Sequence, residues 1–346
     1  MNRSIEPREA ILVLGMHRSG TSALTRVLAL CGASLPARLM PAAPESNETG
    51  FWESQVLVDL HDEVLSAMGS SWSDIRSLPQ AWFSSAAAEG FRSRLAEVLA
   101  AEFADARLFV VKDPRLCRLL PLWLPVLAAR SITPRIVIPI RHPLEVAASL
   151  NRREGFDHAR GQALWRSYML AAEHESRGLP RCFVTYDNLL TDWRGVVARI
   201  GAIVDHDWSA TADAAAIDAF LSSKLRHHVV AATDTTDLAP GVDMIFAWMT
   251  TAAAGVAPNV DELDQVAANL AIAETFLGPV IVPLETALAQ KSADLDHWID
   301  AAVQRYAVIE DLRAEIARRD SQTIRVRDSR VRSLVASLRA LMKPRR

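Results

Sequence analysis

Cysteine and lysine are scarce in this sequence of 346 residues, and their scarcity argues against several classes of protein. Only three cysteines occur, Cys31, Cys117 and Cys182, far apart and without a CxxC pair. This argues against a disulfide framework and a structural zinc site, and it predicts a reducing, cytoplasmic environment. Only four of the 38 basic residues are lysine. A lysine at a motif position is therefore informative, because it is a compact point charge.

Long hydrophobic runs are also absent. The apolar run at residues 11–15 is too short for a signal peptide, and the longest uncharged stretch, between Asp243 and Asp261, is interrupted by Thr, Pro and Asn. We therefore expect no signal peptide and no transmembrane helix. Half of the residues are hydrophobic and 23% are charged, which is typical of a globular protein and not of a disordered chain.

The net charge is small but unevenly distributed. The whole chain carries −3, whereas residues 305–346 contain twelve basic and five acidic residues, a local charge of +7. No nucleic-acid partner is expected for the chain. Only its C-terminal part suits an anionic surface, which predicts a protein that is cytoplasmic or peripheral to the inner membrane.

Strand and helix patterns alternate along the first two thirds of the chain. Short aliphatic runs predict buried strands at residues 11–14, 108–111, 135–140 and 182–185. Helical periodicity predicts helices at residues 21–30, 54–68, 86–104, 143–152, 160–175 and 190–204. This alternation predicts an α/β fold with a parallel sheet flanked by helices, although Pro139 weakens the third strand locally.

The predicted organisation also includes an insertion and a helical C-terminal extension. Residues 1–230 are predicted to form the α/β domain, with residues 40–85 as a long functional insertion over the C-terminal edge of the sheet. Residues 231–282 are predicted to extend the core with helices. Residues 283–346 are predicted to form one or two long basic amphipathic helices, which suit a lipid surface, a protein partner or docking on their own domain. Polar sequence at residues 318–330 interrupts the apolar face, so a sustained coiled coil is not established.

The loop GMHRSGTS, at residues 15–22, follows the first strand and precedes a helix. Free amides and the dipole at a helix N-terminus favour a bound phosphate. The two glycines have the spacing of a Walker A loop, but Thr21 stands where a P-loop nucleotide kinase or NTPase needs lysine. Arg18 is instead the cation of this loop.

A second motif, RHPLEVAAS at residues 141–149, follows the third strand. Arg141 can donate two N–H groups to one phosphate, and Ser149 follows two helical turns later. The two motifs together resemble the sulfotransferases that use 3′-phosphoadenosine 5′-phosphosulfate (PAPS), which have a P-loop-like fold. The resemblance covers residues 11–190, and it implies that PAPS is the donor and that no metal is required.

The resemblance also implies which residues bind the donor. In these enzymes the first motif holds the 5′-phosphosulfate and the second holds the 3′-phosphate, and a tyrosine near the fourth strand lies by the nucleotide. The donor-binding residues are then His17, Arg18, Ser19, Gly20, Thr21, Ser22, Arg141, Ser149 and Tyr186. Lys224 and Arg226 are predicted to replace the cations of a C-terminal family segment that this sequence lacks.

Sulfuryl transfer requires cations at the leaving group and one general base. Arg18 and Lys112 are predicted to stabilise the leaving group. Cytosolic members of the family have a histidine base where this chain has Pro114, whereas carbohydrate- and tyrosine-directed members use a glutamate. The resemblance therefore implies Glu53, at the head of a helix in the insertion, as the base. Asp113, His61 and Glu45 are alternatives, and Glu53 could also serve only its helix N-terminus.

The acceptor is predicted to be a hydroxyl of a saccharide or glycolipid. The insertion contains Trp52, Trp72 and Trp82, which suit either an aromatic platform for sugar rings or a small core. The rival interpretations are a P-loop nucleotide kinase or NTPase and a non-catalytic nucleotide-binding scaffold.

Overall fold

A computed structural model of the chain describes residues 8–42, 50–221 and 236–341. The chain divides into two units, Met1–Ile272 and Ala273–Arg346. The first unit contains both motifs and the sheet. The second contains most of one long helix, α11 (Asp261–Leu341).

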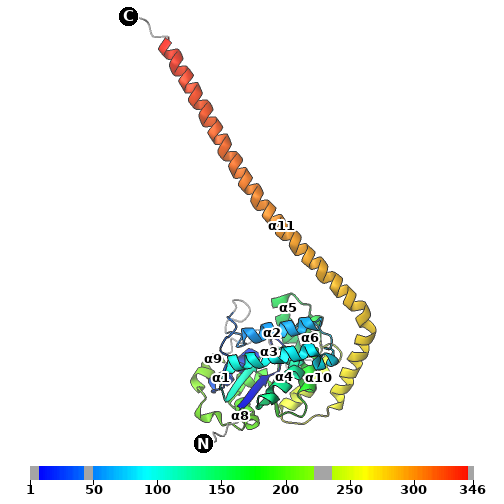
Figure 1. Ribbon diagram of the computed structural model, residues 1–346. Coiled ribbons are helices and arrows are strands. Elements are labelled where there is room, and N and C mark those ends of the chain that lie inside the picture. Colours follow the sequence, from blue (N-terminus) through cyan, green and yellow to red (C-terminus); the bar gives the residue numbers. More distant parts are fainter. Residues whose placement is uncertain (1–7, 43–49, 222–235, 342–346) are drawn as a thin grey trace. The chain divides into compact units, whose positions relative to one another are not determined.

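The sheet is built from β1 (Arg8–Val13), β2 (Leu108–Lys112), β3 (Ile132–Ile140) and β4 (Arg181–Thr185). Their spatial order is β2-β1-β3-β4, and every neighbouring pair is parallel. Figure 1 shows helices packed around these strands. Both motifs follow central strands, β1 and β3, whose carboxyl ends lie at the same edge of the sheet. The predicted α/β fold class is therefore confirmed.

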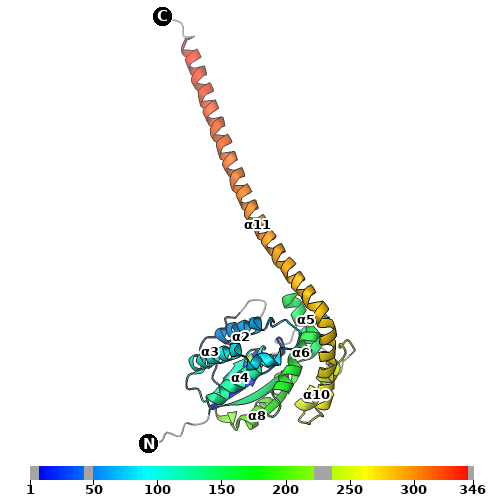
Figure 2. The ribbon, with the colours of Figure 1, turned by 45° about the vertical axis from the view of Figure 1, so that its right-hand side comes forward.

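Each face of the sheet has its own hydrophobic core, because side chains alternate along a strand. Ile11 and Val13 lie in one core, whereas Leu12 and Leu14 lie in the other. The first core is covered by α1 (Thr21–Leu30), α8 (Trp193–Val204) and α9 (Ala214–Phe220). The second is covered by α2 (Gln55–Ala67), α3 (Ala86–Phe103), α4 (Leu116–Ala129), α5 (Pro143–Glu154), α6 (His158–Glu175) and α10 (Val242–Ala253). Figure 2 shows α3 and α8 on opposite sides of the strands.

Three short helices complete the described part of the first unit: η1 (Gln80–Ser84), α7 (Tyr186–Thr191) and η2 (Trp208–Ala210). The predicted helix at residues 190–204 is in fact two helices, α7 and α8, and Asp192 lies between them as the N-cap of α8. The side chain of Asp192 accepts a hydrogen bond from the amide of Gly195, which explains why a new helix begins there.

Helix α4 was not predicted from the sequence. It contains Pro121 and Pro125, and a proline inside a helix removes a backbone hydrogen bond. Leu119, Leu120 and Trp123 are nonetheless completely buried. Burial of these large side chains offsets the lost hydrogen bonds, so tertiary packing decides the helix.

Pro139 lies within β3 and does not interrupt it. The amide of Ile136 donates to Pro180, on the β4 side, so the nitrogen of Pro139, three residues later, faces β1. The pairing of β1 with β3 ends at Val13 and Val137, and no ladder bond to β1 is needed at Pro139. Gly15, just after β1, lies close to Pro139: a Cβ added to Gly15 would lie 2.9 Å from the Pro139 ring.

Helix α11 has no single stretch that is long and apolar enough to cross a membrane, as judged over the described residues. One bent pair of segments within it, Asp261–Ile281 and Thr286–Leu338, passes this test jointly by length and composition alone. The helix contains Pro279 and Pro283 close to the bend. Proline is a common cause of such bends.

Gly161 allows α5 and α6 to pack closely, because a Cβ at this position would lie 2.8 Å from the Cα of Ala147. We predict that Gly161→Ala lowers the free energy of unfolding by about 1–3 kcal/mol through overpacking. The control is Gly90→Ala in α3, where an added Cβ meets no atom within 4 Å. It should raise stability by about 0.5–1 kcal/mol through helix propensity. Urea denaturation measures both, and equal effects would contradict the close helix contact.

Candidate active site

The loop between β1 and α1 has a backbone shape that only certain residues tolerate. Arg18 has a φ of 69° and Gly20 a φ of 82°, both in the left-handed region. A Cβ on Gly20 would also collide with the ring of Tyr186. Glycine is therefore required at position 20 for two reasons: the left-handed φ and the closeness of the Tyr186 ring. The contact places Tyr186, at the end of β4, against the predicted phosphate loop.

The two predicted phosphate-binding elements meet at Arg18. Its Nε donates a hydrogen bond to the Oγ of Ser149, at 2.8 Å. Arg141 Nη1 donates to the backbone oxygen of Arg18, at 3.1 Å, and its guanidinium lies 4.8 Å from the centre of the Tyr186 ring. Glu145 pairs with the Nε of Arg141 at 2.8 Å. Arg18, Arg141, Ser149 and Tyr186, which come from separate segments, therefore form one cluster, and their contacts with a donor stay a prediction.

This cluster is strongly positive. Burial, together with the charges of Arg153, Arg141 and Arg152, lowers the pKa of Arg18 to about 10. Like charges that are held together in this way favour a bound anion, which would relieve their repulsion. Ser19 Oγ is buried and has no hydrogen-bond partner among the described residues. A hydroxyl of this kind fits a phosphate or sulfate oxygen, so the site suits an anionic group.

Lys112, at the end of β2, connects the phosphate loop to the insertion. Its Nζ donates to the Oγ of Ser22 at 3.0 Å and to the backbone oxygen of Phe51 at 3.0 Å, and it forms an ion pair with Glu53. The side chains of Lys112 and Glu53 are 3% and 7% exposed. Ser22 Oγ also donates to the oxygen of Phe51, at 3.2 Å. Two residues predicted to be catalytic, Lys112 and Glu53, are thus in direct contact.

The pKa of Glu53 lies above that of an exposed glutamate. Burial raises the pKa of Glu53, and the positive charge of Lys112 opposes that rise without cancelling it. A carboxylate with a raised pKa accepts a proton more readily than an exposed one. The N-cap of α2 is Ser54 and not Glu53. The helix-dipole interpretation alone therefore does not account for the buried position of Glu53.

Asp113 has the opposite electrostatics. Burial alone would raise the pKa of Asp113, but the charge of Arg115 and hydrogen bonds from His61 and Arg115 lower it far below the ordinary aspartate range. Oδ1 accepts from the amide and Nη1 of Arg115, at 2.9 and 3.0 Å, and Oδ2 is bound to His61 Nδ1 at 2.8 Å. An acid so stabilised in its charged form is a poor proton acceptor.

The hydrogen bonds of His61 determine which ring nitrogen donates and which accepts. Trp123 Nε1 donates to its Nε2 at 2.9 Å, and an indole N–H is only a donor. Nε2 is therefore an acceptor, and Nδ1 carries the proton that is donated to Asp113. Neither nitrogen is left for substrate chemistry. Glu45, another alternative base, and Lys224 and Arg226, two predicted donor contacts, lie outside the described residues.

His17 faces the insertion and not the Arg18 cluster. Its ring lies 4.7 Å from the ring of Trp72 and 6.0 Å from that of Tyr168. Burial lowers the pKa of His17 well below its ordinary value, and the charge of Arg115 lowers it further, so the ring is neutral. Nε2 is buried without a partner in the described structure. The backbone of His17 belongs to the loop, but its contact with the donor stays a prediction.

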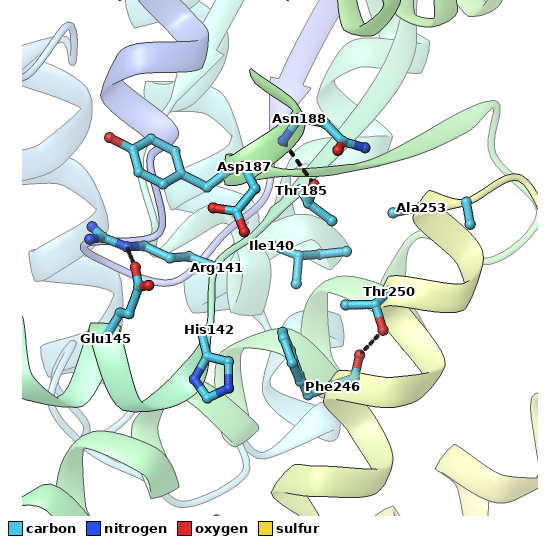
Figure 3. A pocket seen from close by; sticks show the side chains of 12 residues that line it. Ile140, Arg141, His142, Glu145, Thr185, Asp187, Asn188, Phe246, Thr250 and Ala253 are labelled. Carbon is cyan, nitrogen blue, oxygen red and sulfur yellow. Dashed lines mark hydrogen bonds and ion pairs between the residues drawn. The ribbon is translucent and has the colours of Figure 1, made fainter. Parts of the chain in front are cut away.

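A cavity of about 250 Å³ opens beside the Arg18 cluster, at the carboxyl ends of β3 and β4. Figure 3 shows Arg141 and Glu145 on one side and Phe246 and Thr250 of α10 on the other. The contribution of α10 was missed from the sequence, because this apolar helix carries no motif and lies far along the chain. The ring of Phe246 lies 4.8 Å from that of His142, which joins α10 to the second motif.

The three tryptophans of the insertion do not contact one another in the ring contacts of the described residues. Trp52 lies under the guanidinium of Arg26, at 4.5 Å, and Trp72 contacts His17. Trp82 packs on Phe83 and Phe91, away from the loop. Trp82 therefore belongs to a small core, whereas Trp52 and Trp72 flank the loop. No group of three or more His, Cys, Asp or Glu side chains in the described ranges could hold a metal ion.

Comparisons with known proteins place most of the chain in one family. Residues 10–210, more than half of the chain, match the model of the sulfotransferase family. A sulfotransferase domain from the olefin synthase of Synechococcus PCC 7002 is 18% identical, with 70% of this chain and 94% of that chain covered and a TM-score of 0.43. A sulfotransferase domain from the curacin biosynthetic pathway is 15% identical, with 76% and 98% covered and a TM-score of 0.37. No curated protein sequence matches the chain.

The Asp113 network gives a test of how the site is held together. Asp113→Asn leaves Arg115 buried without its main counter-charge, so we predict a loss of about 3–5 kcal/mol in unfolding free energy. The control is Asp62→Asn, which removes the other carboxylate bound to Arg115 but one that is 49% exposed. It should cost less than about 1 kcal/mol.

The pH dependence follows from the lowered pKa of Asp113. Its stabilising effect is complete above the pKa of an unfolded aspartate, about 3.9, and is lost as the pH falls through the lower folded value. The stability gap between wild type and Asp113→Asn should therefore be constant near neutrality and narrow only in strong acid. Urea denaturation over a pH series measures it, and a gap that narrows near neutral pH would contradict the assigned charge.

Proposed function

The chain belongs to the sulfotransferase family, and we propose that it transfers a sulfuryl group from PAPS to an acceptor hydroxyl. Sulfuryl transfer follows from the family, whereas the donor, the acceptor and the catalytic residues are proposals. The observation that carries the proposed donor is the meeting of both phosphate-binding elements at Arg18. A donor with phosphate groups at two ends requires such a pair of sites.

The described residues suggest how the donor would be held. The 5′-phosphosulfate would bind the loop at residues 15–22, with Arg18, Ser19 and the N-terminus of α1. The 3′-phosphate would bind Arg141 and Ser149, which already form hydrogen bonds with the Arg18 residue. The cavity beside Tyr186 offers room for the nucleoside. Lys224 and Arg226 remain predicted contacts.

The proposed chemistry is an in-line displacement on sulfur, akin to phosphoryl transfer. Negative charge develops on the oxygen that leaves with the nucleotide. Arg18 and Lys112 would stabilise that charge, and the loop amides would add to the effect. Both cations are fixed before reaction by hydrogen bonds to Ser149 and Ser22. This fixed arrangement reduces the reorganisation that the reaction would otherwise require.

Glu53 is the proposed general base. It would accept the proton of the acceptor hydroxyl as the oxygen attacks sulfur. Its charge is then neutralised, so the ion pair with Lys112 ends at the moment when charge develops on the leaving oxygen. The ammonium of Lys112 would then interact with the leaving oxygen in place of the Glu53 carboxylate. The direct contact of Lys112 with Glu53 and with the loop residue Ser22 supports this role.

The proposed acceptor is a hydroxyl of a saccharide or a glycolipid. Trp52 and Trp72 flank the phosphate loop and are only partly buried. Aromatic rings of this kind bind the apolar faces of sugars while their polar edges remain available. Trp82 is not part of the proposed acceptor site, because it packs on Phe91 of α3 and against the hydrophobic core.

Arg141 gives a test of the donor. Arg141→Ala should weaken binding of 3′-phosphoadenosine 5′-phosphate by about 1.5–3 kcal/mol, roughly 10- to 150-fold, because a charge-assisted fork is lost. Binding of adenosine 5′-phosphosulfate, which lacks the 3′-phosphate, should change little. Arg141→Lys, which can still pair with Glu145, controls for damage to the fold and should show the same selective loss to a smaller degree. Calorimetry measures each case, and equal losses for both ligands would make Arg141 merely structural.

Glu53 gives a test of the base. Glu53→Gln should lower kcat by roughly 10²–10⁴-fold and keep donor binding, because the substitution removes a proton acceptor and little volume. The acid limb of the kcat/KM profile should disappear with it. Glu63→Gln, an exposed substitution on α2, is the control and should leave kcat unchanged. If kcat falls but the acid limb remains, Glu53 only positions Lys112.

A further inference from the structure

A stretch of α11, residues 288–316, exposes a continuous row of large apolar side chains. Leu288, Leu295, Ile299, Tyr306 and Ile309 are between 47% and 71% exposed, and Ile316 continues the row. In proteins, a helix gains most of its stability by packing such an apolar face against another part of the structure. Exposed aliphatic and aromatic side chains at this density need a partner surface.

The spacing of these residues is that of a coiled coil. Successive members of the row are three and four residues apart: Leu288, Ser292, Leu295, Ile299, Ala302, Tyr306, Ile309, Arg313 and Ile316. In heptad terms the d positions are 288, 295, 302, 309 and 316, and the a positions are 292, 299, 306 and 313. The row ends at Asp320, the next a position. This segment, residues 288–316, is called the seam segment.

The seam residues favour two strands. Leucine at d with isoleucine at a, as in Leu295 and Ile299, is the combination typical of parallel dimers. Ile309 and Ile316 also occupy d positions, but the a residues before them are Tyr306 and Arg313, not the isoleucine or leucine that favours three or four strands with isoleucine at d. Arg313 occupies an a position, where a long cation can reach the solvent at the edge of a two-stranded seam. Arg313 already donates to Glu310 of its own helix, at 2.8 Å. The small Ala302, one turn before Tyr306, leaves room for that ring in the facing helix.

The flanking positions match a parallel partner of the same sequence. In a parallel pair each g residue faces the e residue five positions later in the other helix. Lys291 would then face Asp296, and Arg305 would face Glu310, both attractive pairs. The remaining pairs, Trp298 with Val303 and Leu312 with Ala317, are apolar. Among these four g–e pairs none joins like charges.

The charge of the seam segment argues against an anionic lipid surface as its partner. Residues 288–316 contain three basic and six acidic side chains, a net charge of −3. The basic excess of the C-terminal part lies after this segment, from Arg318 onward. An acidic apolar helix would be repelled by the surface that attracts a basic one.

We propose that the seam segment pairs, in parallel and in register, with the same segment of a second copy of this chain. The protein is then a dimer whose sulfotransferase units are joined through their C-terminal helices. This inference does not rest on the identity of the donor or the acceptor.

The first experiment measures mass by light scattering on the full chain at micromolar concentration. Wild type should have twice the 38.0 kDa mass of one chain. Ile299→Lys combined with Ile309→Lys places charges in the seam and should halve the mass. The control combines Gln290→Lys with Gln304→Lys, the same substitutions on the opposite side of the helix, and should remain a dimer. A monomeric wild type, a mass of three or more chains, or an unchanged mass for the seam variant would overturn the proposal.

A second experiment tests direction and register. Ala302→Cys and Ile309→Cys, each at a d position, should each form a disulfide-linked dimer under mild oxidation, whereas Gln304→Cys should not. In an antiparallel pair at most one of the two d positions could meet its own copy. Cys31 and Cys117 are buried, and Cys182, which is partly exposed, is present in the Gln304→Cys control as well. A linked dimer from only one of the d positions would overturn the parallel register.

Vesicles containing phosphatidylglycerol test the alternative that the seam segment binds an anionic lipid surface. The wild type and the seam variant should sediment with them to the same extent, because the seam is acidic and faces the second copy. If the wild type is monomeric and only the seam variant loses sedimentation, the helix binds lipid and the proposal fails.

Discussion

The site depends on one buried cation, the ammonium of Lys112. A buried charge must have partners, and this one has three, which come from the phosphate loop and the insertion. These partners tie the end of β2 to Ser22 at the start of α1 and to Phe51 and Glu53 before α2. The insertion is held over the sheet edge by this interaction, which brings the carboxylate to the place where the sulfuryl group would be transferred.

Glu53 and Asp113 show how partners assign different roles to two buried acids. Asp113 is surrounded by an arginine fork, a histidine N–H and a backbone amide, so its charged form is strongly favoured and its pKa falls. For Glu53, the charge of Lys112 does not offset the effect of burial, so the pKa of Glu53 rises. Fixed acids hold a structure, and acids with raised pKa values exchange protons. The arrangement therefore gives Asp113 a structural role and supports the proposal of Glu53 as the base.

The Arg18 cluster and the seam segment have one feature in common: each holds side chains whose unfavourable surroundings a bound partner would relieve. Arg18, Arg141 and their arginine neighbours repel one another, which an anion would relieve. The apolar row on α11 is exposed to water, which a second helix would relieve. In both cases the chemistry of the groups indicates the kind of partner that we propose: an anion for the arginines and a second apolar helix for α11.

The sequence by itself determined the sheet, the helices that begin with clear caps and the two phosphate motifs. These features depend on residues close together in the chain, such as the alternation in β1 or the glycine of the loop. The tertiary structure decided the rest. Helix α4 forms despite two prolines because its side chains are buried, and α10 reaches the cavity from more than fifty residues beyond β4. The choice between Glu53, Asp113 and His61 was also open in the sequence. It depends on contacts with Lys112, Arg115 and Trp123, and a local pattern cannot encode the burial and long-range pairing that set a pKa.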